Sequence, residues 1–246
     1  LSSEVKTVKL RPGVYSISAS LTVANDNIGI IGSGPLATQI LHSVTSDNAL
    51  EFTAGSTLNY NVVKDIGFQA TGTPTNVAIN LSDCANATIE NIYVTNFDDA
   101  VKFTTVTNSR INNLTTVAMR NFSIHLLSTS NGIAINGFDL DGDDSSSTRG
   151  VFANAAHGIS FSGGSIKDSE WGMELQACEI SFDGAIESTT LGCFLFPGTG
   201  GALTVLSGYY RNIGTTAVYN TTSTGQNNIT VVYHNLITDA TEPANV

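Results

Sequence analysis

The 246-residue chain is poor in charge, and above all in basic charge. Only 13% of its residues are charged, with ten Lys and Arg against 21 Asp and Glu, so the net charge at pH 7 is −11. This balance argues against a nucleic-acid or anionic-membrane partner, because both require a basic surface. No stretch approaches the roughly 20 apolar residues that cross a bilayer. The sequence therefore predicts no membrane insertion, and a partner that is neutral, or acidic and bound at a local basic patch.

Cysteine is also scarce. Cys84, Cys178 and Cys193 have no metal-ligand spacing and form no disulfide framework. Cys178 and Cys193 lie in apolar contexts and are predicted to be buried free thiols. Phosphate-binding loops, dinucleotide fingerprints and nucleophile elbows are absent as well, so we predict neither a cofactor nor a metal.

Turn-forming residues, by contrast, recur at a fixed interval. A four-residue pattern of an apolar residue, a polar residue, Asn, Asp or Gly, and usually another apolar residue occurs eight times, in steps of 21 to 27 residues. These three types best tolerate a left-handed backbone. A period in the twenties indicates a solenoid. The third position of the pattern is Asp65, Asn91, Asn113, Gly137, Gly163, Gly184, Gly208 and Asn235.

Apolar residues alternate around each of these turns, as in the segments Ile133-Ala-Ile135 and Ile180-Ser-Phe182. A period of two indicates β-strands. The sequence thus predicts an all-β, single-stranded parallel β-helix of about nine or ten rungs, in one domain over residues 1–246. Residues 1–44 would form the opening rungs and 45–246 the regular ones, and a start at Leu1 suggests a fragment of a longer chain. From Asn91 to Gly208 the turn residues should stack in line, mostly at positive φ, so that Gly184→Val would cost about 1 kcal/mol or more.

The N-terminal part resembles a known family. The strings VKLRPGVYSISASLTV and NIGIIGSGPLATQIL, within residues 8–41, resemble the opening rungs of pectate-lyase-like right-handed β-helices. There a Pro-Gly-x-Tyr turn ends one strand and an Ile-x-Gly-x-Gly segment opens the next coil. Viral tailspikes and many polysaccharide lyases and hydrolases share this start. The resemblance implies a right-handed coil and carbohydrate as the substrate class, but no particular reaction.

Two further strings are similar to polygalacturonase motifs. FDDAVKF (97–103) looks like that family's Asp-Asp-Cys-Val-Ala-Ile segment, and AHGISFSGG (156–164) looks like its Gly-His-Gly-Ile-Ser segment. In that family the two lie on neighbouring rungs, whereas Asp99 and His157 are 58 residues apart. The family's other Asp and its Arg-Ile-Lys motif have no counterpart, and the rung pattern itself generates such strings.

A candidate site follows from the turn column. Seven residues after four consecutive turns stand Asp98, Arg120, Asp144 and Glu170, and equal offsets on stacked rungs lie on one face. From a turn residue to the strand that follows it, the chain is longest between Gly137 and Val151, which includes DLDGDDSSSTRG; a protruding loop there would form one wall of a groove. Paired carboxylates can divide acid and base roles at a glycosidic bond. We predict as catalytic Asp98, Asp99, Asp144 and Glu170, and as substrate-binding Arg120, Asp141 and Trp171.

Within this set Glu170 is the predicted acid, because the only tryptophan, Trp171, would exclude water beside it while Asp144 stays ionised. Three alternatives remain open. The carboxylates can be solvated turn residues, or the aspartates at 141, 143 and 144 can hold calcium. His125 and His157 are interpreted as turn or stack residues rather than bases.

The functional hypothesis is a viral tailspike or tail-fibre domain on the virion tail. It would bind host cell-surface polysaccharide, with or without cleaving it, and tailspike rods are typically homotrimers. The run CFLFPG and a tandem Tyr suggest exposed apolar residues for association, at Phe194, Phe196, Tyr209 and Tyr210. The alternatives are a secreted polysaccharide lyase or hydrolase of the pectate-lyase-like class, and a non-catalytic adhesin or spacer.

Overall fold

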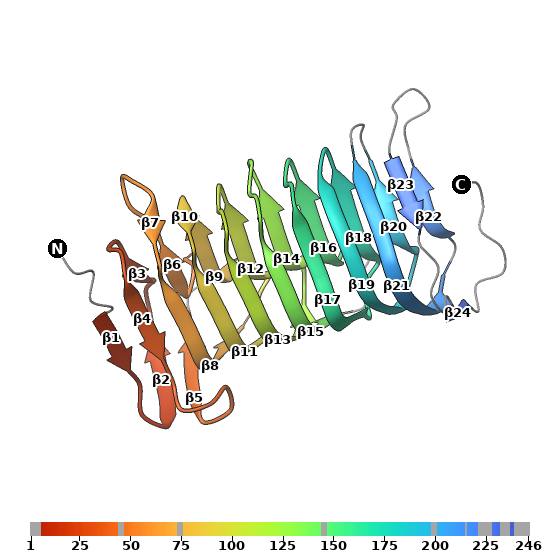
Figure 1. Ribbon diagram of the computed structural model, residues 1–246. Coiled ribbons are helices and arrows are strands. Elements are labelled where there is room, and N and C mark those ends of the chain that lie inside the picture. Colours follow the sequence, from red (N-terminus) through yellow and green to blue (C-terminus); the bar gives the residue numbers. More distant parts are fainter. Residues whose placement is uncertain are drawn as a thin grey trace.

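The structure, a computed structural model, is a rod built from parallel strands that stack as a β-solenoid of about eight turns (Figure 1). It describes residues 6–43, 47–72, 76–143, 147–197, 201–214, 216–220, 228–231 and 237–238. These residues contain no helix, and thus none long and apolar enough to cross a membrane. The predicted right-handed parallel β-helix is confirmed, with a rung count close to the expected one.

Two sheets run the length of the rod, with β1 and β23 near its opposite ends (Figure 1). The path of the 13-stranded sheet is β1 (Lys6–Lys9), β4 (Ile28–Ile31), β8 (Val62–Ala70), β11 (Thr88–Thr95), β13 (Arg110–Met119), β15 (Ala134–Gly142), β17 (Ile159–Lys167), β19 (Glu179–Thr189), β21 (Ala202–Ile213) and β23 (Asn228–Val231). Off this path lie β2 (Gly13–Ile17), β5 (Thr38–His42) and β24 (Ile237–Thr238).

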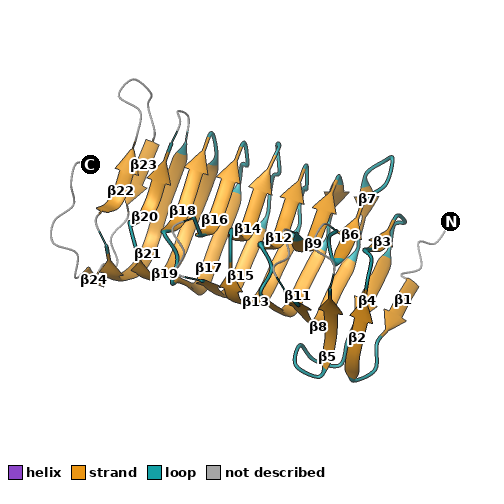
Figure 2. Ribbon diagram, turned by 180° about the vertical axis from the view of Figure 1, so that it is seen from behind, coloured by secondary structure: helices purple, strands orange, loops and turns teal. Residues whose placement is uncertain are grey.

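The nine-stranded sheet forms a second wall of the rod, visible from behind in Figure 2. Its strands are β3 (Leu21–Val23), β6 (Leu50–Phe52), β9 (Val77–Ser82), β12 (Asp99–Thr104), β14 (Phe122–Leu127), β16 (Arg149–Asn154), β18 (Trp171–Gln176), β20 (Gly192–Phe196) and β22 (Thr216–Asn220). A short ladder pairs β7 (Leu58–Asn59) with β10 (Cys84–Ala85), each of which lies in the chain between a strand of the nine-stranded sheet and the next strand of the 13-stranded sheet. Isolated β-bridges continue this ladder along the rod up to His157.

From β8 to β21 the strands of the 13-stranded sheet are long because each of them serves two walls. In the opening rungs β4 and β5 are separate, and both pair with β8, β4 with its first half and β5 with its second. The bend falls at Asp65, whose φ is 58°. A left-handed residue thus lets one strand turn a corner of the coil without a loop.

Alternate residues of every wall point into one continuous core. Ile124 and Leu126 of β14 are fully buried, as are Ile135 and Leu140 of β15. Phe161 and Phe182 stack from rung to rung inside it, with ring centroids 6.3 Å apart. The three cysteines are buried free thiols, as predicted for two of them.

The predicted turn column exists, but with one correction. Asp65, Asn91, Asn113, Gly137 and Gly163 all have φ between 53° and 68° and follow one another along the sheet. A register shift follows, so that Gly184 pairs with Gly164 and Gly208 pairs with Gly184. Neither Gly184 nor Gly208 has a left-handed backbone. Both are glycines because a Cβ would collide with neighbouring atoms, and Asn235 lies outside the described residues.

The predicted exposed aromatic patch is wrong. Phe194, Phe196 and Tyr210 are 4%, 0% and 6% exposed, and Tyr209 is half-buried. Phe194 packs edge-on against both Phe182 and Tyr210 in the core. The run CFLF is apolar throughout because all five residues of β20 are buried, whichever face they point to.

Candidate functional site

The outer face of the nine-stranded sheet carries the main gathering of polar and aromatic side chains. In each strand the residue between two core residues points outward, such as His125 between Ile124 and Leu126. The register places such residues in one outward column, which runs Glu51, Asn80, Lys102, His125, Phe152, Glu174 and Leu195. A second row, at the strand starts, runs Asp99, Phe122, Arg149 and Trp171.

Asp99 begins β12 and is 5% exposed. Its carboxylate lies 2.8 Å, through Oδ2, from Nδ1 of His125, and its Oδ1 accepts a hydrogen bond of 3.1 Å from Nδ2 of Asn121. A carboxylate can only accept, so Nδ1 of His125 carries the hydrogen. His125 and Asn121 thus hold the Asp99 carboxyl group through both of its oxygens, beneath the strand starts.

Asp98 stands in a different environment, one residue earlier. Its Oδ1 is 3.7 Å from Nε of Arg120, which also donates through Nη2 to the carbonyl of Asn96 at 2.9 Å. Burial raises the pKa of Asp98 above the ordinary 3.8, by more than Arg120 lowers it, and Asp99 raises it further. Adjacent carboxyl groups with unlike surroundings can hold a proton and a charge side by side.

Three rings extend this cluster to the next rung. Phe122 stacks on Phe152 with centroids 5.0 Å apart, and both meet the ring of His125 edge-on, at 4.5 and 5.2 Å. Phe122 and Phe152 are half-buried on the outward face. They form an apolar platform directly beside the Asp99–His125 pair.

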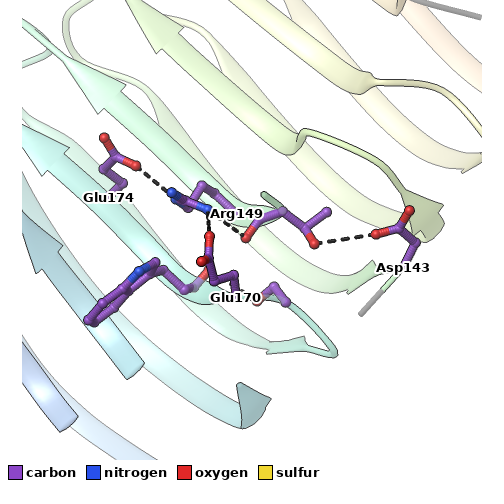
Figure 3. A network of polar contacts seen from close by, with 7 residues as sticks. Asp143, Arg149, Glu170 and Glu174 are labelled. Atoms are coloured by element: carbon purple, nitrogen blue, oxygen red, sulfur yellow. Dashed lines mark hydrogen bonds and ion pairs between the residues drawn. The ribbon is translucent and has the colours of Figure 1, made fainter. Parts of the chain in front are cut away.

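A second polar cluster lies further along the rod, around Arg149 (Figure 3). Its Nε donates to Oε2 of Glu174 at 2.8 Å, and its Nη1 contacts Oε2 of Glu170. All three side chains are mostly buried, between 14% and 18% exposed. Asp143 joins through the hydroxyl of Thr148, 3.4 Å away. A carboxylate held by a guanidinium is stabilised as the anion, whereas a general acid must carry a proton.

The predicted site residues fall into three places. Asp98, Asp99 and Arg120 come together at the first cluster, and Glu170 and Trp171 lie at the second. Asp141 is on the other wall, in the 13-stranded sheet, with its Oδ2 3.8 Å from Nζ of Lys167. Asp144 lies outside the described residues. Trp171 is 6% exposed, so the open rings on this face are those of Phe122 and Phe152.

The strand register explains why residues seven positions after each turn are not all aligned with one another across the rungs. The amide of Glu170 bonds the carbonyl of Thr148, so Thr148 and Arg149 align with Glu170 and Trp171. The chain from Gly137 to Thr148 is longer than in other rungs, and the alignment moves by several residues. Asp98, Asn121, Thr148 and Glu170 occupy successive rungs. At about 4.8 Å a rung, Asp98 and Glu170 are about 14 Å apart, too far to flank one glycosidic bond.

The calcium alternative involves residues that have other partners. Asp141 pairs with Lys167, and Asp143 accepts from Thr148. Within the described ranges, no group of three or more His, Cys, Asp or Glu side chains is arranged to hold a metal ion.

The polygalacturonase-like strings do not meet. His157 is an exposed residue that bridges to Asn131, in the line of single bridges beyond the strand ends, whereas Asp99 begins its strand. The histidine that reaches Asp99 is His125. Sequence reasoning missed the roles of His125 and Arg149. Their positions between core residues or at the strand start carry a signal, since alternation places a polar residue outward.

Comparison with known proteins supports the fold and leaves the family open. No family model and no curated protein matches the chain. Among solved structures, it is similar to the pectate lyase Pel9A, with a TM-score of 0.65 at 10% identity over 96% of this chain and 70% of that one. It is also similar to the enzymatically active domain of tailspike protein 2 of bacteriophage CBA120, with a TM-score of 0.61 at 11% identity and 95% of this chain covered. A third neighbour is ORF18 of Geobacillus virus E2, with a TM-score of 0.59 at 13% identity and 94% of this chain covered.

These likenesses show a pectate-lyase-like parallel β-helix similar to that of phage tailspike domains. The chain spans about half the length of the two viral proteins, 43% of the tailspike domain and 54% of ORF18.

Proposed function

We propose that the protein binds a cell-surface polysaccharide along the outer face of its nine-stranded sheet and cleaves it, as a tailspike domain of a virion. The observation that carries this proposal is the pair Asp98 and Asp99, two adjacent carboxyl groups in unlike environments next to an aromatic platform. The tailspike and pectate-lyase neighbours support carbohydrate as the ligand class.

In this proposal the reaction is hydrolysis of a glycosidic bond. Asp98, with its raised pKa, donates a proton to the leaving oxygen. The attacking water gives its proton to Asp99, while His125 and Asn121 hold that carboxylate in place. Phe122 and Phe152 pack against the apolar face of a sugar ring. Glu170, bound to Arg149, contacts a sugar further along the chain rather than acting as the acid.

The assembly is part of the same proposal. We infer a homotrimer of such rods at a virion tail, from the resemblance to tailspikes. The buried residues of β20 contribute nothing to this inference, since Phe194 and Phe196 face no solvent. Sedimentation at micromolar concentration tests it. A trimer supports the tailspike assignment, and a monomer favours the alternative of a secreted polysaccharide hydrolase or lyase.

The test of the chemistry is release of reducing ends from a panel of capsular polysaccharides and lipopolysaccharide O-chains. Asp98→Asn should lower the rate of cleavage of a responsive polysaccharide by about 10²- to 10⁴-fold, the usual contribution of a general acid, while binding persists. Asp183→Asn, the same change on the 13-stranded sheet, is the control. Binding without cleavage by the wild type would identify a non-catalytic adhesin. Full activity of Asp98→Asn would remove the assignment of Asp98.

A further inference from the structure

We infer that the polysaccharide bound by this face is uncharged, built from neutral or N-acetylated sugars, and is not a polyuronate. This inference rests on the proposed function and concerns the same site. It goes against the expectation raised by a pectate-lyase neighbour, whose name denotes an enzyme acting on a polyuronate. It depends on which groups of the protein the cations of the outer face already contact.

Both guanidinium groups of the face are already bound to carboxylates of the protein. Arg149 is held from two sides, by Glu170 and by Glu174. Arg120 pairs with Asp98 and is fixed to a backbone carbonyl. Arginine recognises a ligand carboxylate through its fork of N–H donors, and on Arg149 two of the three nitrogens of that fork, Nε and Nη1, already contact carboxylates of the protein. A uronate group would have to displace a mostly buried ion pair, and breaking such a pair leaves an uncompensated charge.

The charge balance of the face points the same way. The described outward residues and strand starts provide five carboxylates against three permanent cations. The carboxylates are Glu51, Asp98, Asp99, Glu170 and Glu174, and the cations are Lys102, Arg120 and Arg149. With His125 neutral, the face thus has an excess of two negative charges when Asp98 is ionised and of one when Asp98 carries its proton. A polyuronate adds one negative charge per sugar, and like charges brought together oppose binding.

What the face offers instead suits hydroxyl and acetamido groups. A carboxylate oxygen accepts several hydrogen bonds, so Glu174 and Glu170 can each receive a sugar hydroxyl while they hold Arg149. The amide of Asn80, whose Nδ2 donates to Glu51 at 3.2 Å, lies in the same column. The stacked rings of Phe122 and Phe152 provide the apolar contact that fixes a sugar ring in place.

The test measures the affinity of the whole chain for polygalacturonate, for alginate and for the neutral members of a panel of O-chains and capsular polysaccharides. Each is measured at low and at high sodium chloride. We expect a neutral polymer to bind at least about tenfold more tightly than either polyuronate, with affinity nearly independent of salt. The residual binding of polyuronate should rise with salt, because screening weakens repulsion.

A pair of matched variants isolates the cause. Glu174→Gln removes one carboxylate from Arg149, and should strengthen polygalacturonate binding by about three- to tenfold, which corresponds to on the order of 1 kcal/mol. Glu90→Gln makes the same change on the 13-stranded sheet, where Glu90 pairs with Lys64, and should leave polygalacturonate binding unchanged.

The two ideas fail separately. Tighter binding of polyuronate than of any neutral polymer, weakened by salt, would overturn the inference and leave the proposed polysaccharide-binding function standing. An equal gain in polygalacturonate affinity in Glu174→Gln and Glu90→Gln would also overturn it, because the effect would then depend on the net charge of the protein and not on Arg149. Absence of binding to every polymer of the panel would overturn the proposed function and the inference with it.

Discussion

Two glycines on neighbouring rungs, Gly163 and Gly184, should differ in how much their substitution by asparagine destabilises the protein. Gly163 has a φ of 68°, and a Cβ built there meets no atom within 4 Å. Gly184 has no left-handed backbone, but its Cβ would lie 2.7 Å from the carbonyl oxygen of Gly164 and 3.1 Å from Cζ of Phe182. Gly163 is thus required by its backbone conformation, and Gly184 by the lack of space for a Cβ.

The magnitudes follow from these two causes. Gly163→Ala should lower the free energy of unfolding by about 1–2 kcal/mol, the penalty of a left-handed residue with a Cβ. Gly163→Asn should lower the free energy of unfolding by only about a few tenths of a kcal/mol, because asparagine avoids most of the left-handed penalty. Asn91 and Asn113 hold the same position on their rungs, at φ of 53° and 57°. At Gly184, alanine and asparagine should both cost about 1–3 kcal/mol, since a contact with backbone cannot be relieved by a rotamer.

Urea unfolding followed by far-ultraviolet circular dichroism measures the four variants. The slope with denaturant should stay constant, so that a change of midpoint reports stability. The decisive comparison is between the two asparagine variants, which add the same atoms. If Gly184→Asn were tolerated as well as Gly163→Asn, the register shift between β17 and β19 would be wrong, and with it the steric explanation.

Three further predictions concern titratable groups. Burial lowers the pKa of His42, so the folded state binds fewer protons than the unfolded state. The free energy of unfolding should therefore be highest above pH 6.5, the ordinary pKa of histidine, and should decline as the pH falls below it. His42→Gln should flatten this decline in urea midpoints measured from pH 7.5 to 5, whereas the change His157→Gln, at an exposed site, should not. Arg120→Ala removes the influence that lowers the pKa of Asp98, so the basic limb of the pH–rate profile should move to higher pH, and a downward move would contradict the assigned acid. The three cysteine thiols have a pKa raised by burial, so an alkylating reagent at pH 7.5 should label none in the native protein and all in urea; rapid native labelling would disprove their burial.

The fold could be predicted from the sequence because its period is marked by residue types that tolerate a left-handed backbone. Asn91 and Asn113 stand at corners where a chain must adopt a left-handed backbone, and few other residues do so at low cost. A second left-handed column was missed. Asn86, Asn108, Gly132 and Gly158 form it, each five residues before a member of the first column. The same search at a second offset would have found it.

The site was predictable only in part, because it depends on loop length as well as on period. Asp98 and Arg120 were placed together correctly, since the chain between their rungs has regular length. The longer chain before Thr148 put Thr148 where Asp144 was expected, in register with Glu170, and no period reveals how many extra residues a loop contains. Trp171 shows a second limit. Its burial depends on the packing of the neighbouring rungs, which sequence alternation alone does not specify.

The spacing of the two clusters gives the site its functional form. Asp98 and Glu170 lie three rungs apart, or about 14 Å at 4.8 Å a rung, so both cannot act on one bond. Asp98 has a pKa raised by burial and lies beside Asp99, whose carboxyl group contacts His125. Arg149 satisfies the carboxylates at the far end, which leaves them as fixed hydrogen-bond acceptors. A polymer lying across successive rungs would therefore react at the first cluster and be positioned by the second. This division follows because burial outweighs Arg120 at Asp98, whereas Glu170 and Glu174 are both held by Arg149.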